Sequence, residues 1–176
     1  MNHLATSKED ILAASRDLIK ENGWAAVSIR AVASRCSVSA GTIYNYYESK
    51  ADLLSDTIES IWHEIFFHPE DEQAFHDVES CISWIYERLE YGNRQFPGFF
   101  SLHSFGFMRD EKTSGKKRMM KTWGHILNGL CEVLGNDPKV RADVFDQEFT
   151  EKKFADILFS LILVSMIRQD YDPSSV

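Results

Sequence analysis

Cysteine, proline and long apolar runs are all scarce in this chain of 176 residues, and each scarcity excludes a class of protein. The three cysteines, Cys36, Cys81 and Cys131, are too far apart for a C-x-x-C metal motif, and their odd number argues against a disulfide framework. The longest strongly apolar run, residues 157–167, is shorter than the roughly 18 residues that cross a bilayer. The N-terminus has no basic-then-apolar signal segment. We therefore expect a cytoplasmic protein with no membrane partner.

Motifs for catalysis and for metal binding are also missing. The sequence has no G-x-x-x-x-G-K-[ST] loop, no G-x-S-x-G elbow and no Cys/His nucleophile pattern. His63 and His68 are five residues apart, which places them about 140° apart around a helix, so they cannot share one metal ion. We therefore expect no enzyme activity, no catalytic residue, no metal and no cofactor.

Charge is distributed unevenly along the chain. The formal net charge of −8 argues by itself against a nucleic-acid partner, because phosphate binding depends on Lys and Arg. Residues 1–50, however, contain six basic and five acidic side chains. Residues 51–176 contain 13 basic and 22 acidic side chains, and all twelve phenylalanines. This contrast predicts two domains, 1–50 and 51–176, with the negative charge concentrated in the second.

Apolar residues recur at helical spacing along most of the chain, so the sequence predicts an all-α fold. Ser7 and Asp10 have the spacing of a capping box at the start of a first helix. Ser28 can cap a short second helix, and Ser39 can cap a third helix over 40–46 after a turn. Two short helices joined by a tight turn predict a helix-turn-helix, which places one helix in the major groove of DNA.

The residues of this predicted third helix also suit a DNA contact. Its first residues are small or hydroxylated, so its N-terminus can approach phosphates and base edges. The run 38–54, VSAGTIYNYYESKADLL, together with residues 23–24 and 28–33, resembles the signature of the tetracycline-repressor (TetR) family of transcriptional regulators. That family often has a glycine where this chain has Ser37. Ser37 must therefore adopt a backbone conformation that glycine accepts more freely.

The resemblance implies a three-helix DNA-binding domain over 1–50 and a larger helical domain over 51–176 that binds an effector and dimerises. It also implies DNA contacts, position by position. Ser28 matches a phosphate contact and Arg30 matches a position that often reaches a base. The remaining expected contacts lie on the third helix and just after it: Ser39, Ala40, Gly41, Thr42, Tyr44, Tyr46 and Lys50. Because Ala40 and Gly41 have no hydrogen-bonding side chain, direct readout would depend on Arg30, Tyr44 and methyl packing.

Large apolar side chains are abundant in the second domain. The resemblance implies an effector pocket there, and such side chains line small-molecule sites. The candidates are Trp62, Phe66, Trp84, Phe100, Phe105, Met108 and Trp123. Any one of them could equally fill an ordinary core. If they form a pocket, the effector is mainly apolar or aromatic.

The last predicted helix is apolar nearly all round, which is unusual for a surface helix of a small domain. Burial between two subunits would account for it, and a central core helix in a monomer is the alternative. The expected interface residues are Phe154, Leu158, Leu161, Ile162 and Met166. A homodimer would place two recognition helices about 34–36 Å apart on a palindromic operator.

Taken together, these patterns predict a homodimeric repressor that a small effector releases from double-stranded DNA. Two other interpretations stay open. The C-terminal domain could bind a protein partner in place of a small molecule. Alternatively, the chain could be an apolar-ligand carrier or enzyme in which the helix-turn-helix is merely structural.

Overall fold

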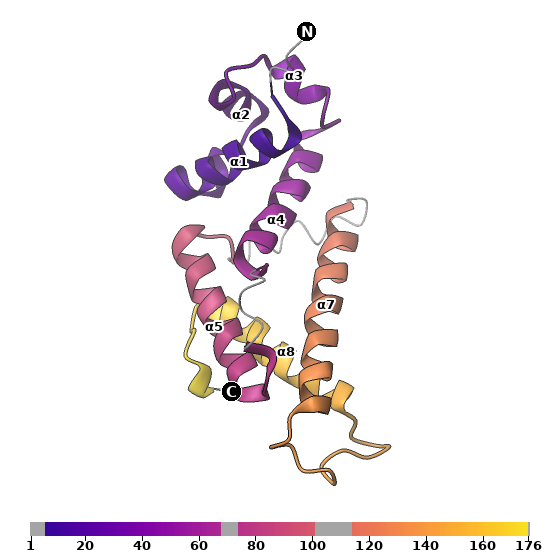
Figure 1. The fold of residues 1–176 in the computed structure, drawn as a ribbon. Coiled ribbons are helices and arrows are strands. Elements are labelled where there is room, and N and C mark those ends of the chain that lie inside the picture. The colour runs from indigo at the N-terminus through magenta and orange to yellow at the C-terminus, as the bar shows by residue number, and fades with distance from the viewer. Residues whose placement is uncertain (1–5, 68–73, 101–113, 176) are drawn as a thin grey trace. The chain divides into compact units, whose positions relative to one another are not determined.

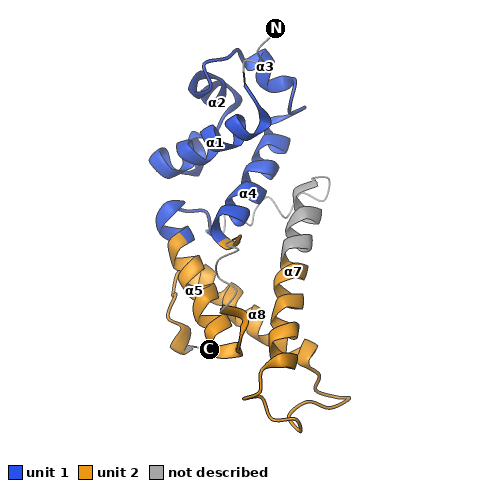
Figure 2. Ribbon diagram, in the orientation of Figure 1, with its two compact units in different colours: residues 1–65, 92–118 blue, residues 66–91, 119–176 orange. Residues whose placement is uncertain are grey.

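The computed structural model describes residues 6–67, 74–100 and 114–175, with only the backbone for 114–122 and 175. Within these residues all regular structure is helical, which confirms the predicted all-α class (Figure 1). The chain divides into two compact units. The first comprises residues 1–65 and 92–118, and the second comprises residues 66–91 and 119–176 (Figure 2). No helix in the described part of the chain is long and apolar enough to cross a membrane.

Local capping signals set the helices of the first unit. Ser7 and Asp10 form the predicted capping box, with the Asp10 amide donating to Ser7 Oγ at 3.1 Å. The chain leaves the first helix at Gly23, whose φ of 77° suits glycine. The elements are α1 (Lys8–Asn22), the 3-10 turn η1 (Trp24–Ala26), α2 (Ile29–Arg35), α3 (Ala40–Tyr44) and α4 (Lys50–Phe66). Helix α3 therefore ends two residues before the predicted end.

Ser37, in the turn between α2 and α3, has the left-handed backbone conformation that was expected for this position. Ser37 has φ of 56°, in the left-handed region. The amide of Val38 donates to the carbonyl of Ala33 at 2.9 Å, a bond that spans five residues and closes α2 as in a Schellman motif. This closure redirects the chain into α3, so Ser37 supports the helix-turn-helix at the cost of a strained backbone.

The first unit has a continuous apolar core. Val32 and Ile43 are fully buried, so α2 and α3 pack through their apolar faces, and Ile11 and Ile61 add buried faces of α1 and α4. An aromatic group extends this core, with Phe99 packing on Trp24, Trp62, Phe96 and Phe100 at ring-centre distances of 5.1 to 6.3 Å. The segment after α5 therefore belongs to the same compact unit as the helix-turn-helix.

Helix α5 (Val78–Gln95) crosses α4 at a glycine. A Cβ atom on Gly92 would lie 2.6 Å from Ile65 Cδ1 and 3.0 Å from Phe100 Cζ. The first distance is shorter than real contacts and the second is tight, so a larger residue at this position would force the side chains of Ile65 and Phe100 to shift.

The second unit contains most of α5, α7 (Ser114–Asn136) from residue 119, α8 (Glu151–Arg168) and the 3-10 turn η4 (Pro173–Ser175). The buried hydroxyls of Tyr86 and Ser165 are 2.8 Å apart and join α5 to α8. Asp137 is buried and accepts from the amide of Val78 at 2.9 Å, and Lys139 pairs with Asp77 at 2.8 Å. These bonds fix the start of α5 against the loop after α7.

Candidate nucleic-acid interface

Serine side chains fix the start of both helices of the helix-turn-helix. Ser28 Oγ accepts from the amide of Ala31 at 3.2 Å, and Ser39 Oγ accepts from the amide of Thr42 at 3.1 Å. The hydroxyls of Ser39 and Thr42 are also 3.0 Å apart. Both serine side chains therefore cap their helices. A DNA phosphate would have to bind the same hydroxyls while they cap.

The outer surface of α3 is unusually bare. Gly41 is exposed and Ala40 is half-buried, so neither presents a polar group. Tyr44 is 55% exposed and is the large side chain of this surface. The buried Ile43 anchors the opposite face. A helix with a buried apolar face and an accessible outer face of small residues can approach another surface closely.

Four of the six cations in residues 1–50 are engaged in ion pairs. Lys8 pairs with Asp56 at 2.6 Å. Arg35 makes a two-bond contact with Glu21, which lowers the pKa of that carboxyl and raises the pKa of the guanidinium. Arg16 and Lys20 both pair with Glu64, at 3.1 and 2.6 Å. These cations stabilise the unit and are neutralised within it.

Arg30 on α2 and Lys50 at the start of α4 differ from the other four. Both are exposed, and neither has an ion pair or hydrogen bond within the described residues. They are the two cations that the sequence assigned to DNA. The charges that were expected to meet a phosphate or a base edge thus have no ion-pair partner in the part of the chain that the structure describes.

Tyr46 lies differently from expectation. The resemblance to the TetR family placed Tyr46 among the expected DNA contacts. Its side chain is half-buried, and its hydroxyl donates to the carbonyl of Thr6 at 2.6 Å. Because its single hydroxyl hydrogen is already donated, Tyr46 cannot also donate to a phosphate while this bond holds. Its observed contact is with the chain segment just before α1.

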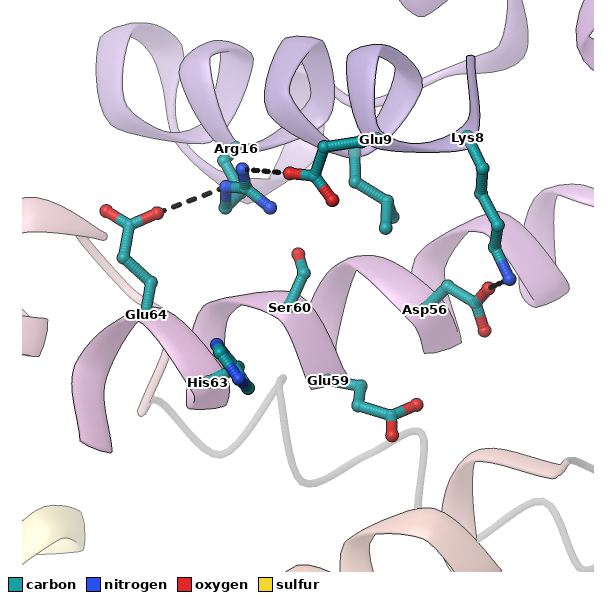
Figure 3. A pocket seen from close by; sticks show the side chains of 9 residues that line it. Lys8, Glu9, Arg16, Asp56, Glu59, Ser60, His63 and Glu64 are labelled. Atoms are coloured by element: carbon teal, nitrogen blue, oxygen red, sulfur yellow. Dashed lines mark hydrogen bonds and ion pairs between the residues drawn. The ribbon is translucent and has the colours of Figure 1, made fainter. Parts of the chain in front are cut away.

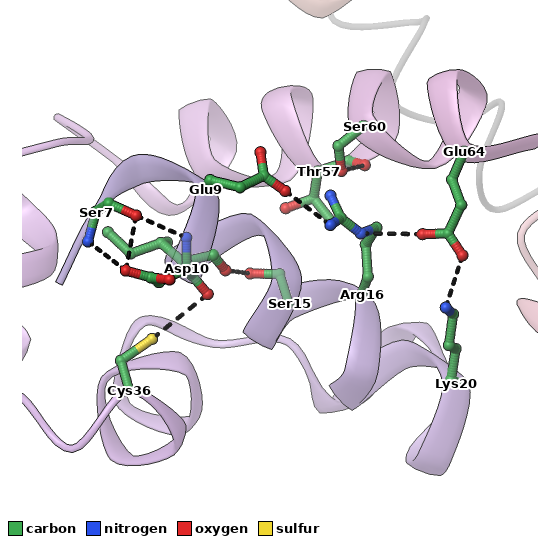
Figure 4. Close-up of polar contacts among 11 residues, drawn as sticks. Ser7, Glu9, Asp10, Ser15, Arg16, Lys20, Cys36, Thr57, Ser60 and Glu64 are labelled. Atoms are coloured by element: carbon green, nitrogen blue, oxygen red, sulfur yellow. Dashed lines mark hydrogen bonds and ion pairs between the residues drawn. The ribbon is translucent and has the colours of Figure 1, made fainter. Parts of the chain in front are cut away.

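A charged cleft of about 550 Å³ separates α1 from α4 (Figure 3). The Lys8–Asp56 pair closes one end and the Arg16–Glu64 pair the other, as the close-up shows. Arg16 also contacts Glu9 at 2.9 Å, so one guanidinium joins carboxylates from both helices (Figure 4). This network was not predicted from the sequence. Its partners are up to 48 residues apart, as in the Arg16–Glu64 pair, and no local pattern marks them.

Those expected effector residues that the structure describes are divided between the two compact units. Trp62 and Phe100 are 6% and 1% exposed and pack on each other in the core of the first unit. For these two the alternative of core packing is therefore the observed one. In the second unit, Trp84 packs edge-on against Phe66, and Trp123 packs against Phe159. Phe105 and Met108 lie outside the described residues.

Helix α8 presents two apolar faces. Leu158, Ile162 and Met166 are buried inside the chain, so three of the expected interface residues fill its own core. Phe154 is half-buried beside Phe145 and Phe149. The exposed apolar face consists of Ile157, Leu161, Val164 and Ile167, between 39% and 52% exposed. Neighbouring residues differ by about 100° around a helix, so the buried and the exposed apolar residues of α8 lie on different faces. The sequence alone did not show which of the two faces the chain buries.

Comparisons with known proteins agree on the helix-turn-helix. Residues 11–57 match the family model "Bacterial regulatory proteins, tetR family". The HTH-type transcriptional regulator UidR of Escherichia coli strain K12 is 38% identical over 48 residues, which are 27% of this chain and 24% of UidR. The HTH-type transcriptional repressor KstR of Rhodococcus jostii strain RHA1 is 45% identical over 47 residues, 27% of this chain and 22% of KstR. The matched part is thus about a quarter of each of these relatives.

A solved structure extends the likeness beyond the helix-turn-helix. The crystal structure of the transcriptional regulator FadR from Bacillus subtilis in complex with stearoyl-CoA is similar with a TM-score of 0.65. The alignment covers 96% of this chain and 92% of that chain at 18% identity. The fold is therefore shared along nearly the whole chain, while the sequence likeness is concentrated in the helix-turn-helix. These two relatives and this structural neighbour are transcriptional regulators.

Proposed function

We propose that this chain regulates transcription by binding DNA through its helix-turn-helix, because residues 11–57 match the model of the tetR family of bacterial regulatory proteins. One observation carries the proposal. Of the six cations in residues 1–50, Arg30 and Lys50 are exposed and have no ion-pair partner within the described residues, whereas the other four are paired. Unpaired exposed cations are the groups that can neutralise phosphates.

The proposed contacts divide by chemistry. Lys50 holds a phosphate. The hydroxyl of Ser28, which also caps α2, and the hydroxyl of Thr42, which lies 3.0 Å from that of Ser39, add weaker phosphate bonds. Arg30 reads a base edge, where its planar guanidinium can fork onto guanine. Tyr44 meets the DNA through its exposed ring and hydroxyl. Residues 1–50 act as the DNA-binding domain in this assignment, and residues 51–176 bind the effector and the second subunit.

A second copy of this chain completes the proposed regulator. The exposed apolar face of α8 supports this step, because Ile157, Leu161 and Val164 recur at spacings of four and three, typical of a helix–helix seam. A twofold dimer would present two recognition helices to a palindromic operator. Light scattering should report a dimer for the wild type and a monomer for Leu161→Glu. Gln147→Glu, on an exposed loop, is the matched control and should stay dimeric.

The effector is proposed to be mainly apolar and to bind in the second unit. The aromatic contacts of Trp84 with Phe66 and Phe75 support an apolar wall there. The likeness in fold to a FadR structure that holds stearoyl-CoA, a ligand with a long apolar chain, points the same way. Effector binding would favour a state in which α4 reorients the helix-turn-helix, and the ligand can shift that equilibrium only by its differential affinity for the two states. By analogy with the repressor KstR, DNA release then relieves repression in the cytoplasm.

Selection of bound sequences from random DNA tests the central proposal. The full-length wild type should enrich an inverted repeat whose half-sites are about 10 base pairs apart, centre to centre. Metabolite fractions can then be screened for release of that DNA. If repeated selection enriches no sequence at moderate salt, the chain is not a sequence-specific DNA-binding protein and the proposal fails.

A further inference from the structure

Helix α3 is too short to hold its own position. It has five residues, and isolated helices of fewer than about 12 residues are only marginally stable in water. Its orientation therefore depends on tertiary contacts. The fully buried Ile43 fixes its inner face. The amides of Tyr46 and Tyr47 both donate to the carbonyl of Ile43, at 3.0 and 3.1 Å. Contacts that hold these two tyrosines thus also hold the last turn of α3.

Both tyrosines are held by residues at the start of α1. The hydroxyl of Tyr46 donates to the carbonyl of Thr6 at 2.6 Å, and Thr6 is buried. Tyr47 is also buried, and the ammonium of Lys8 lies 5.6 Å from the centre of its ring, a distance typical of a cation–π contact. The chain just after α3 is therefore attached at two points to the chain at the start of α1.

The acceptor of the Tyr46 hydroxyl has a defined position of its own. Thr6 directly precedes Ser7, whose amide donates to Asp10 Oδ2 at 2.8 Å in the capping box. The thiol of Cys36, at the end of α2, contacts the carbonyl of Asp10 at 3.8 Å (Figure 4). The start of α1 is thus fixed by its own cap and by α2, so it can serve as a rigid support for α3.

We propose that Tyr46 is a positioning residue that holds α3 in its DNA-reading orientation through the carbonyl of Thr6 and does not itself contact DNA. This inference rests on the proposed function. A phosphate only accepts hydrogen bonds, so the single hydroxyl hydrogen of Tyr46 can serve Thr6 or a phosphate, but not both. Holding α3 in place before DNA arrives lowers the cost of ordering it on binding.

The first test needs no DNA. The full-length variant Tyr46→Phe removes the hydroxyl and keeps the ring. We expect amide hydrogen exchange of residues 40–47 to become faster by about two- to tenfold, the range that corresponds to one hydrogen bond. Tyr91→Phe, at a half-buried tyrosine of the second unit, is the matched control and should leave this exchange unchanged. Unchanged exchange of residues 40–47 in Tyr46→Phe would overturn the inference.

The second test uses the operator selected by the wild-type protein. Affinity is measured well below the melting temperature of both proteins, where a mere loss of stability does not lower the affinity of the folded chain. We expect Tyr46→Phe to bind this operator about two- to tenfold more weakly than the wild type, and Tyr91→Phe to bind like the wild type. Equal affinity of Tyr46→Phe and the wild type would contradict a positioning role.

Operators with a neutral methylphosphonate at one backbone position at a time separate positioning from direct contact. If Tyr46 acts through Thr6, the ratio of wild-type to Tyr46→Phe affinity should be the same at every substituted position. A ratio that falls towards one at a single position would assign the hydroxyl to that phosphate, and the inference would be wrong. Failure of the wild type to select any operator would refute the proposed function instead, while the exchange measurement would still test the bond to Thr6.

Discussion

Lys20 and Glu64 are 44 residues apart in sequence, yet Lys20 Nζ lies 2.6 Å from Glu64 Oε1. The same ammonium lies 4.9 Å from the centre of the Phe96 ring, so one cation joins α1, α4 and the turn after α5. Arg16 approaches the second oxygen of Glu64 at 3.1 Å. One carboxylate on α4 thus binds two cations of α1 (Figure 4).

Glu64→Gln should weaken this attachment. The change removes the charge that Arg16 and Lys20 share, and both side chains are partly exposed, so solvent screens the pairs. We expect the free energy of unfolding to fall by about 1 kcal/mol at low salt. Chemical denaturation measured at 0.05 M and at 1 M salt checks this, because screening should shrink the difference. Glu132→Gln on an exposed part of α7 is the control. A loss that is equal at both salt concentrations would argue against an ionic origin.

Ser37→Gly should stabilise the first unit. Ser37 has φ of 56°, a conformation that costs a non-glycine residue about 1 to 2 kcal/mol. The greater freedom of glycine in the unfolded chain offsets part of that gain, so we expect a net increase of roughly 0.5 to 1 kcal/mol in the free energy of unfolding. Ser34→Gly, at an exposed position inside α2, should instead destabilise. Thermal denaturation compares the two variants, and a lower melting temperature for Ser37→Gly would contradict the strain assigned to this turn.

Arg30 and Lys50 should affect DNA binding differently. Lys50→Ala should weaken binding to all DNA alike and lower the salt slope by about 1 per site, because one phosphate contact is lost. Arg30→Ala should relax sequence preference at one base position. Because Lys50 is the one cation of residues 1–50 that is assigned to a phosphate, the wild-type slope should be about 1 per subunit. Binding isotherms across salt concentrations and on mismatched operators measure both effects. Equal losses on every sequence for both variants would remove the proposed division of roles.

Asp77→Asn should reduce stability in a pH-dependent way. The bond from Lys139, together with the amide of Ser80, holds the pKa of Asp77 well below its ordinary value of 3.8. Because the folded-state pKa lies below the unfolded-state pKa, ionised Asp77 stabilises the fold above about pH 4. That stability is lost as the pH falls through the folded-state pKa. The melting temperature of Asp77→Asn should thus be lower than that of the wild type at pH 7.

The difference in melting temperature between the wild type and Asp77→Asn should narrow progressively below about pH 4. Asp156→Asn, at an exposed carboxylate on α8, is the control and should show little change at either pH. A gap for Asp77→Asn that stays constant down to pH 2 would mean that the side chain acts through packing and not through its charge.

Much of the first unit was determined by short-range sequence patterns. The Ser7–Asp10 capping box and the serine caps at Ser28 and Ser39 all join residues three apart, so the sequence alone places the helix starts. The left-handed conformation of Ser37 was also predicted from the sequence, because the TetR family often has glycine at this position. The expectation that Arg30 and Lys50 contact DNA also came from the sequence, through its resemblance to the TetR family.

Tertiary structure decided what depends on distant partners. Lys8, Arg16, Lys20 and Arg35 have the same chemistry as Arg30 and Lys50, and only the packing of α1 against α2 and α4 brings carboxylates to the first four. The hydroxyl of Tyr46 likewise donates to the carbonyl of Thr6, which is 40 residues away in sequence. On α8, packing against the rest of the second unit buries one apolar face and leaves Ile157, Leu161 and Val164 exposed. A residue's type sets the interactions it can make, but its neighbours in space determine which of these remain available for DNA or for a second subunit.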